Sequence, residues 1–262
     1  MKLISLNLNG IRAASNRGLI DFLKQENPDM ICFQEIKASP DQINEHEFED
    51  MGYHCFWYPA YKKGYSGTAI LTRIYPDFVS KGIGVDLFDS EGRVIRADFK
   101  DFSLISAYFP SGTTGEVRQA VKMDFLKDIT TYLNNLKQDR KKLILAGDYN
   151  ICHKPIDINK PNKHLKTSGF LPEEREWVDN FTESGWIDTF RVFCKDSERY
   201  SWWSYRSSGK DENLGWRIDY FMVTEPLKPM LKNADILDNI ILSDHCPITL
   251  EIDFPEQLKT QF

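Results

Sequence analysis

Residues 142–151 read KLILAGDYNI, and they join a strand suited to burial on both faces to a polar end. The run 143–146 is continuously apolar, which is typical of an interior strand in an α/β protein. Asp148 and Asn150 follow two residues apart, so strand alternation points both side chains the same way. This segment therefore predicts a buried sheet that carries reactive groups at one edge.

Other apolar runs repeat the arrangement along the chain, with helical patterns between them. We expect further strands at residues 2–6, 29–33, 53–58, 68–72, 94–99, 104–108, 217–223, 236–242 and 248–254. We expect helices at residues 16–26, 40–52, 116–137 and 172–184. Composition does not shift in a way that marks a linker, so the pattern predicts one α/β domain over residues 1–262. Its sheets should lie inside and its helices outside.

Composition excludes several classes of protein. Aromatic residues make up 13% of the chain, which is unusual for a disordered protein, and no apolar stretch reaches the roughly 20 residues of a membrane span. The first residues enter a strand pattern at once, so we expect no signal peptide. Five cysteines without a CxxC pair indicate a reducing compartment, so we expect a cytoplasmic protein. The net charge of −6 disfavours nonspecific coating of nucleic acid.

Short polar clusters stand where the expected strands meet loops. They are residues 7–10 (NLNG), 34–35 (QE), 148–150 (DYN), Asp219, and 243–245 (SDH). Each alone has an ordinary explanation, because an Asp or Asn after a strand is more often a turn former or a helix cap. Gathered at one rim of a sheet, however, these acidic, amide and imidazole groups would form a metal-assisted phosphodiester site.

A hard cation such as Mg²⁺ could relieve charge on the phosphate and assist the leaving oxygen. Glu35 directly follows a strand and is the natural first ligand, with Asn9 and Asp244 as helpers. Mn²⁺ is an expected substitute for Mg²⁺ in such an oxygen-ligand site.

The remaining groups are suited to handling water and phosphate. Asp148 could accept a proton from water while Asn150 holds its orientation. His245 could donate to a phosphate oxygen, and Asp219 could fix its tautomer and keep it cationic. Two neutral donors are expected on the same phosphate, Asn7 and Tyr108.

A second constellation concerns the partner. Residues 202–206 (WWSYR) and 215–217 (GWR) gather aromatic faces, which stack on bases or sugars, with Arg206 and Arg217, which bind phosphate. We expect one of Trp202 and Trp203, together with Tyr205, to belong to the core. Further cations could form a basic rim, namely Arg12, Arg73, Arg93, Lys160, Lys163 and Lys166.

The order of these motifs resembles one family, the exonuclease III family of apurinic/apyrimidinic endonucleases. Eight segments match it in sequence order: 6–12 (LNLNGIR), 34–37 (QEIK), 64–67 (GYSG), 91–94 (EGRV), 107–110 (AYFP), 146–151 (AGDYNI), 215–220 (GWRIDY) and 243–247 (SDHCP). The resemblance implies a four-layered α/β sandwich of the deoxyribonuclease I-like type, with two central mixed sheets flanked by helices.

The resemblance also implies an activity. It is Mg²⁺-dependent cleavage of duplex DNA on the 5′ side of an abasic site, which leaves a 3′-hydroxyl and a 5′-deoxyribose phosphate. Accessory 3′→5′ exonuclease and 3′-end-cleaning activities, and a monomeric enzyme, are expected with it. By the same resemblance Trp202 and Trp216 wall the pocket for the abasic sugar, and Arg206 lies where the family inserts a side chain into the duplex.

Two alternatives stay open on sequence alone. A phosphoinositide phosphatase or a sphingomyelinase would carry similar catalytic clusters, although the Trp and Arg constellation favours DNA. A catalytically silent DNA-binding or adaptor protein is the second, and it is disfavoured because every expected catalytic position is filled.

Overall fold

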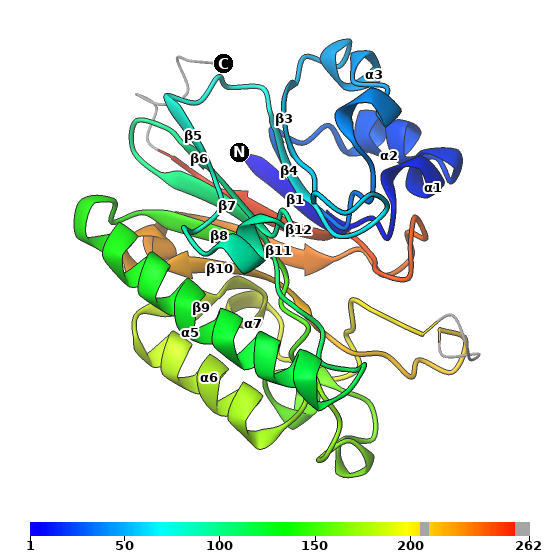
Figure 1. Ribbon diagram of the computed structural model, residues 1–262, viewed down its shortest axis with the longest axis vertical. Coiled ribbons are helices and arrows are strands. Elements are labelled where there is room, and N and C mark those ends of the chain that lie inside the picture. Colours follow the sequence, from blue (N-terminus) through cyan, green and yellow to red (C-terminus); the bar gives the residue numbers. More distant parts are fainter. Residues whose placement is uncertain (205–209, 255–262) are drawn as a thin grey trace.

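Two sheets pack face to face and helices cover both outer surfaces, so the molecule has four layers (Figure 1). The structure, a computed structural model, describes residues 1–204 and 210–254. The expected four-layered α/β sandwich with two mixed sheets is confirmed. In the described part of the chain, no helix combines the length and apolarity that crossing a bilayer requires.

The first sheet contains mainly N-terminal strands together with the last two. Its order is β11 (Leu231–Ile236), β12 (Ile248–Ile252), β1 (Lys2–Asn7), β2 (Met30–Gln34), β4 (Thr68–Thr72) and β3 (His54–Tyr58). Its outer face is covered by α1 (Ile11–Asn16), α2 (Leu19–Glu26) and α3 (His46–Glu49). Phe22 and Phe48 from these helices pack on Ile31 and Phe33 of β2, which provides the apolar burial that holds this layer.

The second sheet has the order β5 (Phe78–Lys81), β6 (Val94–Asp98), β7 (Ser103–Tyr108), β8 (Leu143–Asp148), β10 (Asp219–Thr224) and β9 (Trp186–Asp188). The long helix α5 (Glu116–Asp139) and α6 (Pro172–Glu183) lie across its outer face (Figure 1). Phe125 and Ile129 of α5 pack there against Leu143 and Leu145. The remaining helical segments are short: η1 (Pro40–Gln42), α4 (Asp86–Asp89), η2 (Pro155–Asp157), η3 (Pro161–Lys163), α7 (Thr189–Phe193) and η4 (Glu225–Met230).

Strand β8 is buried on both faces, as its apolar run predicts. Leu143 and Leu145 face the helices, whereas Ile144 and Ala146 face the core between the two sheets. Asp148 continues the second set by alternation, so its carboxylate lies at the edge of the inter-sheet space.

The pairing of strands brings the polar ends to one edge. β1 and β2 run parallel and pair Asn7 with Gln34 at their ends, and β7 and β8 run parallel and pair Tyr108 with Asp148. β10 is antiparallel to β8, so its first residue Asp219 lies opposite Asp148. Segments far apart in sequence therefore end beside one another.

Several expected elements differ from the structure. The helix expected at 16–26 is present as α2 but begins at Leu19, because Gly18 adopts φ +93° just before it, and α1 was not predicted. The helix expected at 40–52 is only η1 and α3. The strand expected at 236–242 is wrong: the strand is β11, at residues 231–236. It pairs with β12 at the sheet edge. Its residues are largely polar and partly exposed, so the segment does not form the apolar run that predicts the other strands. The short edge strands β5 and β9 were also not predicted.

Candidate active site at the shared edge of the two sheets

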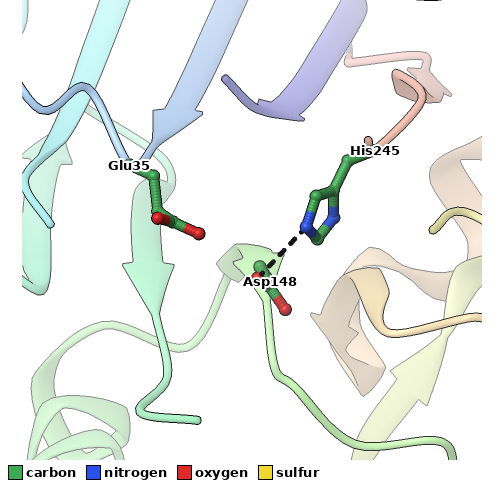
Figure 2. A group of neighbouring side chains, drawn as sticks. All are labelled: Glu35, Asp148 and His245. Atoms are coloured by element: carbon green, nitrogen blue, oxygen red, sulfur yellow. Dashed lines mark ion pairs between the residues drawn. The ribbon is translucent and has the colours of Figure 1, made fainter. Parts of the chain in front are cut away.

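Three acid–base side chains converge where the two sheets meet. Glu35 follows β2, Asp148 ends β8, and His245 lies on the loop before β12, and Figure 2 shows the three side chains pointing toward one another. One ligand-type atom from each lies within 4.8 Å of the others. The His245 Nε2 atom is 3.8 Å from Asp148 Oδ2. The sequence analysis predicts that these three side chains lie close together, and in the structure they do.

Asn7 links the two carboxylates of this cluster. Its Nδ2 donates to Glu35 Oε1 and to Asp148 Oδ2, each at 2.9 Å, and its side chain is fully buried. The Asn7 backbone carbonyl accepts a bond of 2.6 Å from Ser243 Oγ, which also accepts from the backbone N–H of His245. Asn7 therefore lies between Glu35 and Asp148 and holds their two carboxylates in a fixed position relative to each other.

His245 is held by a buried carboxylate. Its Nδ1 lies 2.9 Å from Asp219 Oδ2, and Ser201 Oγ donates to the same oxygen at 2.6 Å. Burial alone lowers the pKa of His245, but the negative charges of Asp219 and Asp148 outweigh it and raise that pKa to about 10. The imidazolium form therefore predominates at neutral pH, as expected for a donor to phosphate.

Asp148 lies in a setting that disfavours its charge. Burial raises its pKa, His245 opposes that effect, and the neighbouring charges of Asp219 and Glu35 raise it further, to about 7. Its Oδ1 accepts the backbone N–H of Asn150 at 2.8 Å, and Asn150 Nδ2 donates to Oδ2 at 3.2 Å and to the Phe109 carbonyl at 3.0 Å. A carboxylate with a pKa near neutrality, oriented by an amide, is suited to accept a proton from water.

The donor set fits a divalent cation. The carboxylates of Glu35 and Asp148 converge on one point and are ligands that such ions take in proteins, whereas His245, held as an imidazolium, has no lone pair to offer a cation. Glu35 Oε2 also lies 2.7 Å from Lys37 Nζ, which donates to Asn9 Oδ1 at 2.5 Å. The Lys37 ammonium is therefore paired with Glu35, the carboxylate that we predict from the sequence as the first metal ligand.

The helper ligands expected from sequence lie beside this cluster and bond to each other. Asn9 Nδ2 donates to Asp244 Oδ1 at 2.9 Å, and Trp202 Nε1 donates to Asp244 Oδ2 at 3.1 Å. Within residues 1–204 and 210–254, the acid–base side chains that converge with Glu35 are Asp148 and His245 and not Asp244. A direct metal bond from Asn9 or Asp244 stays a prediction.

A cavity of about 330 Å³ opens beside these groups. Glu35, Asp148 and His245 line it, and so do two half-buried tryptophans, Trp202 and Trp216. Their rings meet edge to face with centroids 6.0 Å apart. Trp203, the alternate member of the Trp pair, is buried in the core as alternation predicts. Tyr205, also expected in the core, lies outside the described residues.

Residues 4–245 match the endonuclease/exonuclease/phosphatase family. The exodeoxyribonuclease of Bacillus subtilis is 41% identical over 255 residues, which cover 97% of this chain and 100% of that protein. The DNA repair nuclease APEX1 of Danio rerio is 39% identical over 253 residues, covering 95% of this chain and 81% of that protein. The chain belongs to this family.

Solved structures of family members superpose closely. An AP endonuclease from Archaeoglobus fulgidus has a TM-score of 0.87 at 27% identity, and covers 97% of this chain and 100% of that one. A 3′-5′ exonuclease (NExo) from Neisseria meningitidis has a TM-score of 0.90 at 27% identity, with the same coverage. The resemblance to the exonuclease III family is confirmed, and this family member is a phosphodiester hydrolase.

Two arginines expected to contact DNA lie in the interior of this family member. Arg93 is 1% exposed; its Nε pairs with Glu91 at 2.5 Å, and its guanidinium lies over the Tyr108 ring and donates to the Tyr108 carbonyl. Arg217 is 1% exposed and pairs with Asp157 and Asp188 at 2.7 and 2.6 Å. The predicted DNA contacts of both are wrong, because neither guanidinium reaches the surface. They instead support Tyr108 and the wall around Trp216.

Arg73 is a third correction. It follows β4, whose end Thr72 pairs with Met30 at the start of β2, whereas Thr68 pairs with Gln34 next to the site. Arg73 therefore lies at the opposite end of the sheet, where it bonds to Asn27. It cannot join a basic rim around Glu35.

The remaining DNA-binding predictions have different outcomes. Lys160 and Lys163 are exposed on the segment that carries His164, whose ring contacts Trp216 at 5.0 Å between centroids. They stay predictions, placed near the pocket. Arg206 lies outside the described residues.

Sequence reasoning assigned no role to three polar residues that support the site. Lys37 stands two positions after Glu35 inside a matched motif, so its spacing could have revealed it. Ser201 and Lys122 carry no local signal, because their partners Asp219 and Glu174 are distant in sequence. Only tertiary contacts identify these two.

Proposed function

We propose that the protein is a Mg²⁺-dependent DNA repair endonuclease that hydrolyses the phosphodiester 5′ to an abasic site in duplex DNA. The products are a 3′-hydroxyl and a 5′-deoxyribose phosphate, with 3′→5′ exonuclease and 3′-end cleaning as accessory activities. One observation carries the proposal. The acid–base cluster opens onto a small cavity with aromatic walls, Trp202 and Trp216, which suits a flipped-out sugar that has lost its base.

The relatives support the same conclusion. The most similar proteins include a DNA repair nuclease and an exodeoxyribonuclease, and one similar solved structure is a 3′ phosphatase bound to a product DNA hairpin. The site groups come from one chain, so we propose a monomeric enzyme acting on double-stranded DNA.

Each residue of the site has its own role in the proposed reaction, which follows from its charge and its position. His245 as a cation donates a hydrogen bond to a nonbridging phosphate oxygen, and Asp219 keeps it charged and oriented. Asp148 accepts the proton of the attacking water, and Asn150 holds that water against it. Tyr108, which lines the cavity, adds a neutral donor near the phosphate; Asn7, expected to be a second one, donates both amide hydrogens to Glu35 and Asp148 and holds those carboxylates instead. When bound, Mg²⁺ supplies charge relief to the phosphate and to the leaving oxygen, and Glu35 with its neighbours would hold it.

The direct test is cleavage of an oligonucleotide duplex that carries one abasic analogue. We expect incision 5′ to the analogue with Mg²⁺, loss of at least roughly a hundredfold in rate with a chelator, and recovery on adding Mg²⁺ or Mn²⁺. An intact duplex of the same sequence is the control. Full activity in chelator, or preference for a phosphoinositide or sphingomyelin over the abasic duplex, would refute the proposal.

Trp216→Ala is expected to weaken discrimination between abasic and intact duplexes more than it slows chemistry. Trp216 packs on Trp202 and on His164, so its loss opens the wall without touching the acid–base groups. Stacking of one base on an aromatic side chain is worth about 1–3 kcal/mol, which is the largest effect expected for a base-free sugar, and the measurement is the ratio of Kd values for the two duplexes.

The matched control for this change is Tyr75→Ala, an exposed aromatic residue whose ring contacts His54 at the far end of the sheet. That variant should keep the wild-type ratio. If Trp216→Ala weakens binding to both duplexes equally, the wall role of Trp216 is wrong.

A further inference from the structure

A fully buried ion pair lies beneath the site without touching the cavity. Lys122 on α5 and Glu174 on α6 are both 0% exposed, and Lys122 Nζ lies 2.5 Å from Glu174 Oε1. Removing two charges from water is costly, and apolar residues of similar volume often stabilise a fold as well or better. The geometry around the two charges indicates what the pair does.

The Glu174 end is anchored to a loop that lines the cavity. Its Oε2 accepts the backbone N–H groups of Gly169 at 2.6 Å and Leu171 at 2.9 Å, and its Oε1 also accepts from Gln119 at 3.0 Å. A carboxylate with this many donors has one orientation available. Glu174 therefore holds the lysine ammonium at a fixed point.

The Lys122 end reaches the turn after β8. Its Nζ donates to the backbone carbonyl of Asn150 at 2.8 Å. Asn150 has φ +53°, the left-handed region that a non-glycine residue adopts at a cost. This conformation places the Asn150 backbone N–H on Asp148 Oδ1 and its side-chain amide near Oδ2. The charged donor on its carbonyl stabilises the strained turn.

The loop and the turn are also packed directly against each other. A Cβ added at Gly169 would lie 3.1 Å from the Asn150 carbonyl oxygen and 2.8 Å from the Trp216 ring. The Cys152 backbone N–H donates to the Gly169 carbonyl at 2.7 Å. Both ends of the ion pair therefore act on one compact unit behind Asn150.

We propose that Lys122 and Glu174 form a positioning pair that sets the Asn150 amide against the Asp148 carboxylate. Glu174 is fixed by the loop N–H groups, it fixes Lys122, and Lys122 fixes the left-handed turn at Asn150. The inference rests on the proposed function, because incision of an abasic duplex is the reaction in which the placement of Asn150 is measured.

The decisive variant is the double change Lys122→Met and Glu174→Gln. It removes both buried charges together and leaves an amide oxygen to accept the loop N–H groups, so the unfolding midpoint should stay near the wild-type value. We expect kcat to fall about ten- to a hundredfold, because misplacement of a catalytic group by about 1 Å costs on that order. KM should change less than about threefold, since the tryptophan wall keeps its own backbone bonds.

A second variant covers the case in which the double change does not fold. Lys122→Gln has a shorter amide that keeps a bond to Glu174 and loses the one to Asn150, so the same fall in kcat is expected. The control is Asp98→Asn, which breaks a largely buried pair with Arg96 at the opposite end of the second sheet. It should lower the unfolding midpoint and leave kcat unchanged.

Each outcome has a distinct meaning. A folded Lys122 variant with kcat within about twofold of the wild type overturns the positioning role. A fall in kcat that follows the unfolding midpoint, and that Asp98→Asn reproduces, also overturns it. Absence of incision by the wild-type protein itself refutes the proposed function and is seen before any variant is made.

Discussion

Replacing His245 with alanine should reduce kcat for incision of an abasic duplex by at least roughly a hundredfold. The imidazole is buried, is held by Asp219 at 2.9 Å, and has a pKa raised to about 10, so it presents a cation inside the site. Alanine removes the only imidazolium of the described cluster and leaves the phosphate charge without that donor. Single-turnover kinetics at saturating Mg²⁺ measure the effect directly.

The pH dependence gives an independent check on His245. The cation is present below a pKa of about 10 and is lost as the pH rises above it, so the wild-type rate should not fall because of His245 between pH 7 and 9. His46→Ala, at an exposed position on α3, is the control and should keep wild-type kcat. Near-wild-type turnover in a folded His245→Ala protein would remove this residue from the mechanism.

The second large effect is expected for Asp148→Asn, again a loss of at least roughly a hundredfold in kcat. The substitution keeps the volume of the side chain and one acceptor oxygen for the backbone N–H of Asn150, but removes the oxygen that accepts a proton from water. It also removes one of the two carboxylates, Glu35 and Asp148, that converge where a cation could be held. Cleavage should therefore fall while the circular dichroism spectrum and the unfolding midpoint stay close to those of the wild type.

The fold should survive this change for an electrostatic reason. Burial together with the charges of Asp219 and Glu35 raises the pKa of Asp148 to about 7, which shows that its ionised form is disfavoured in this setting. A neutral amide is therefore tolerated. Asp86→Asn, on the short surface helix α4, is the matched control. Full activity in Asp148→Asn would show that another group activates the water.

Local pattern was sufficient for much of the fold. The apolar run before Asp148, the periodicity of α5 and the capping residues of α6 each depend on neighbours within a few positions, so the sequence predicts them. The same applies to Glu35 and Asp148, because the residue at a strand end is defined by the strand. Partly polar edge strands such as β11 lack a continuous apolar run. Only their pairing with a neighbouring strand in the folded structure shows where they lie.

The identity of the site was therefore present in the amino-acid sequence, as polar residues at strand ends and as eight ordered motifs. What each cation does was decided by the tertiary structure. Arg93, Arg217 and Arg73 look like surface charges in sequence, yet two are buried in ion pairs and the third lies at the far end of a sheet. The Lys122–Glu174 pair has no sequence signature at all. The physical reason is that residue type fixes a group's chemistry, whereas its direction, its partners and its exposure to water depend on strand pairing and helix packing between segments distant in the chain.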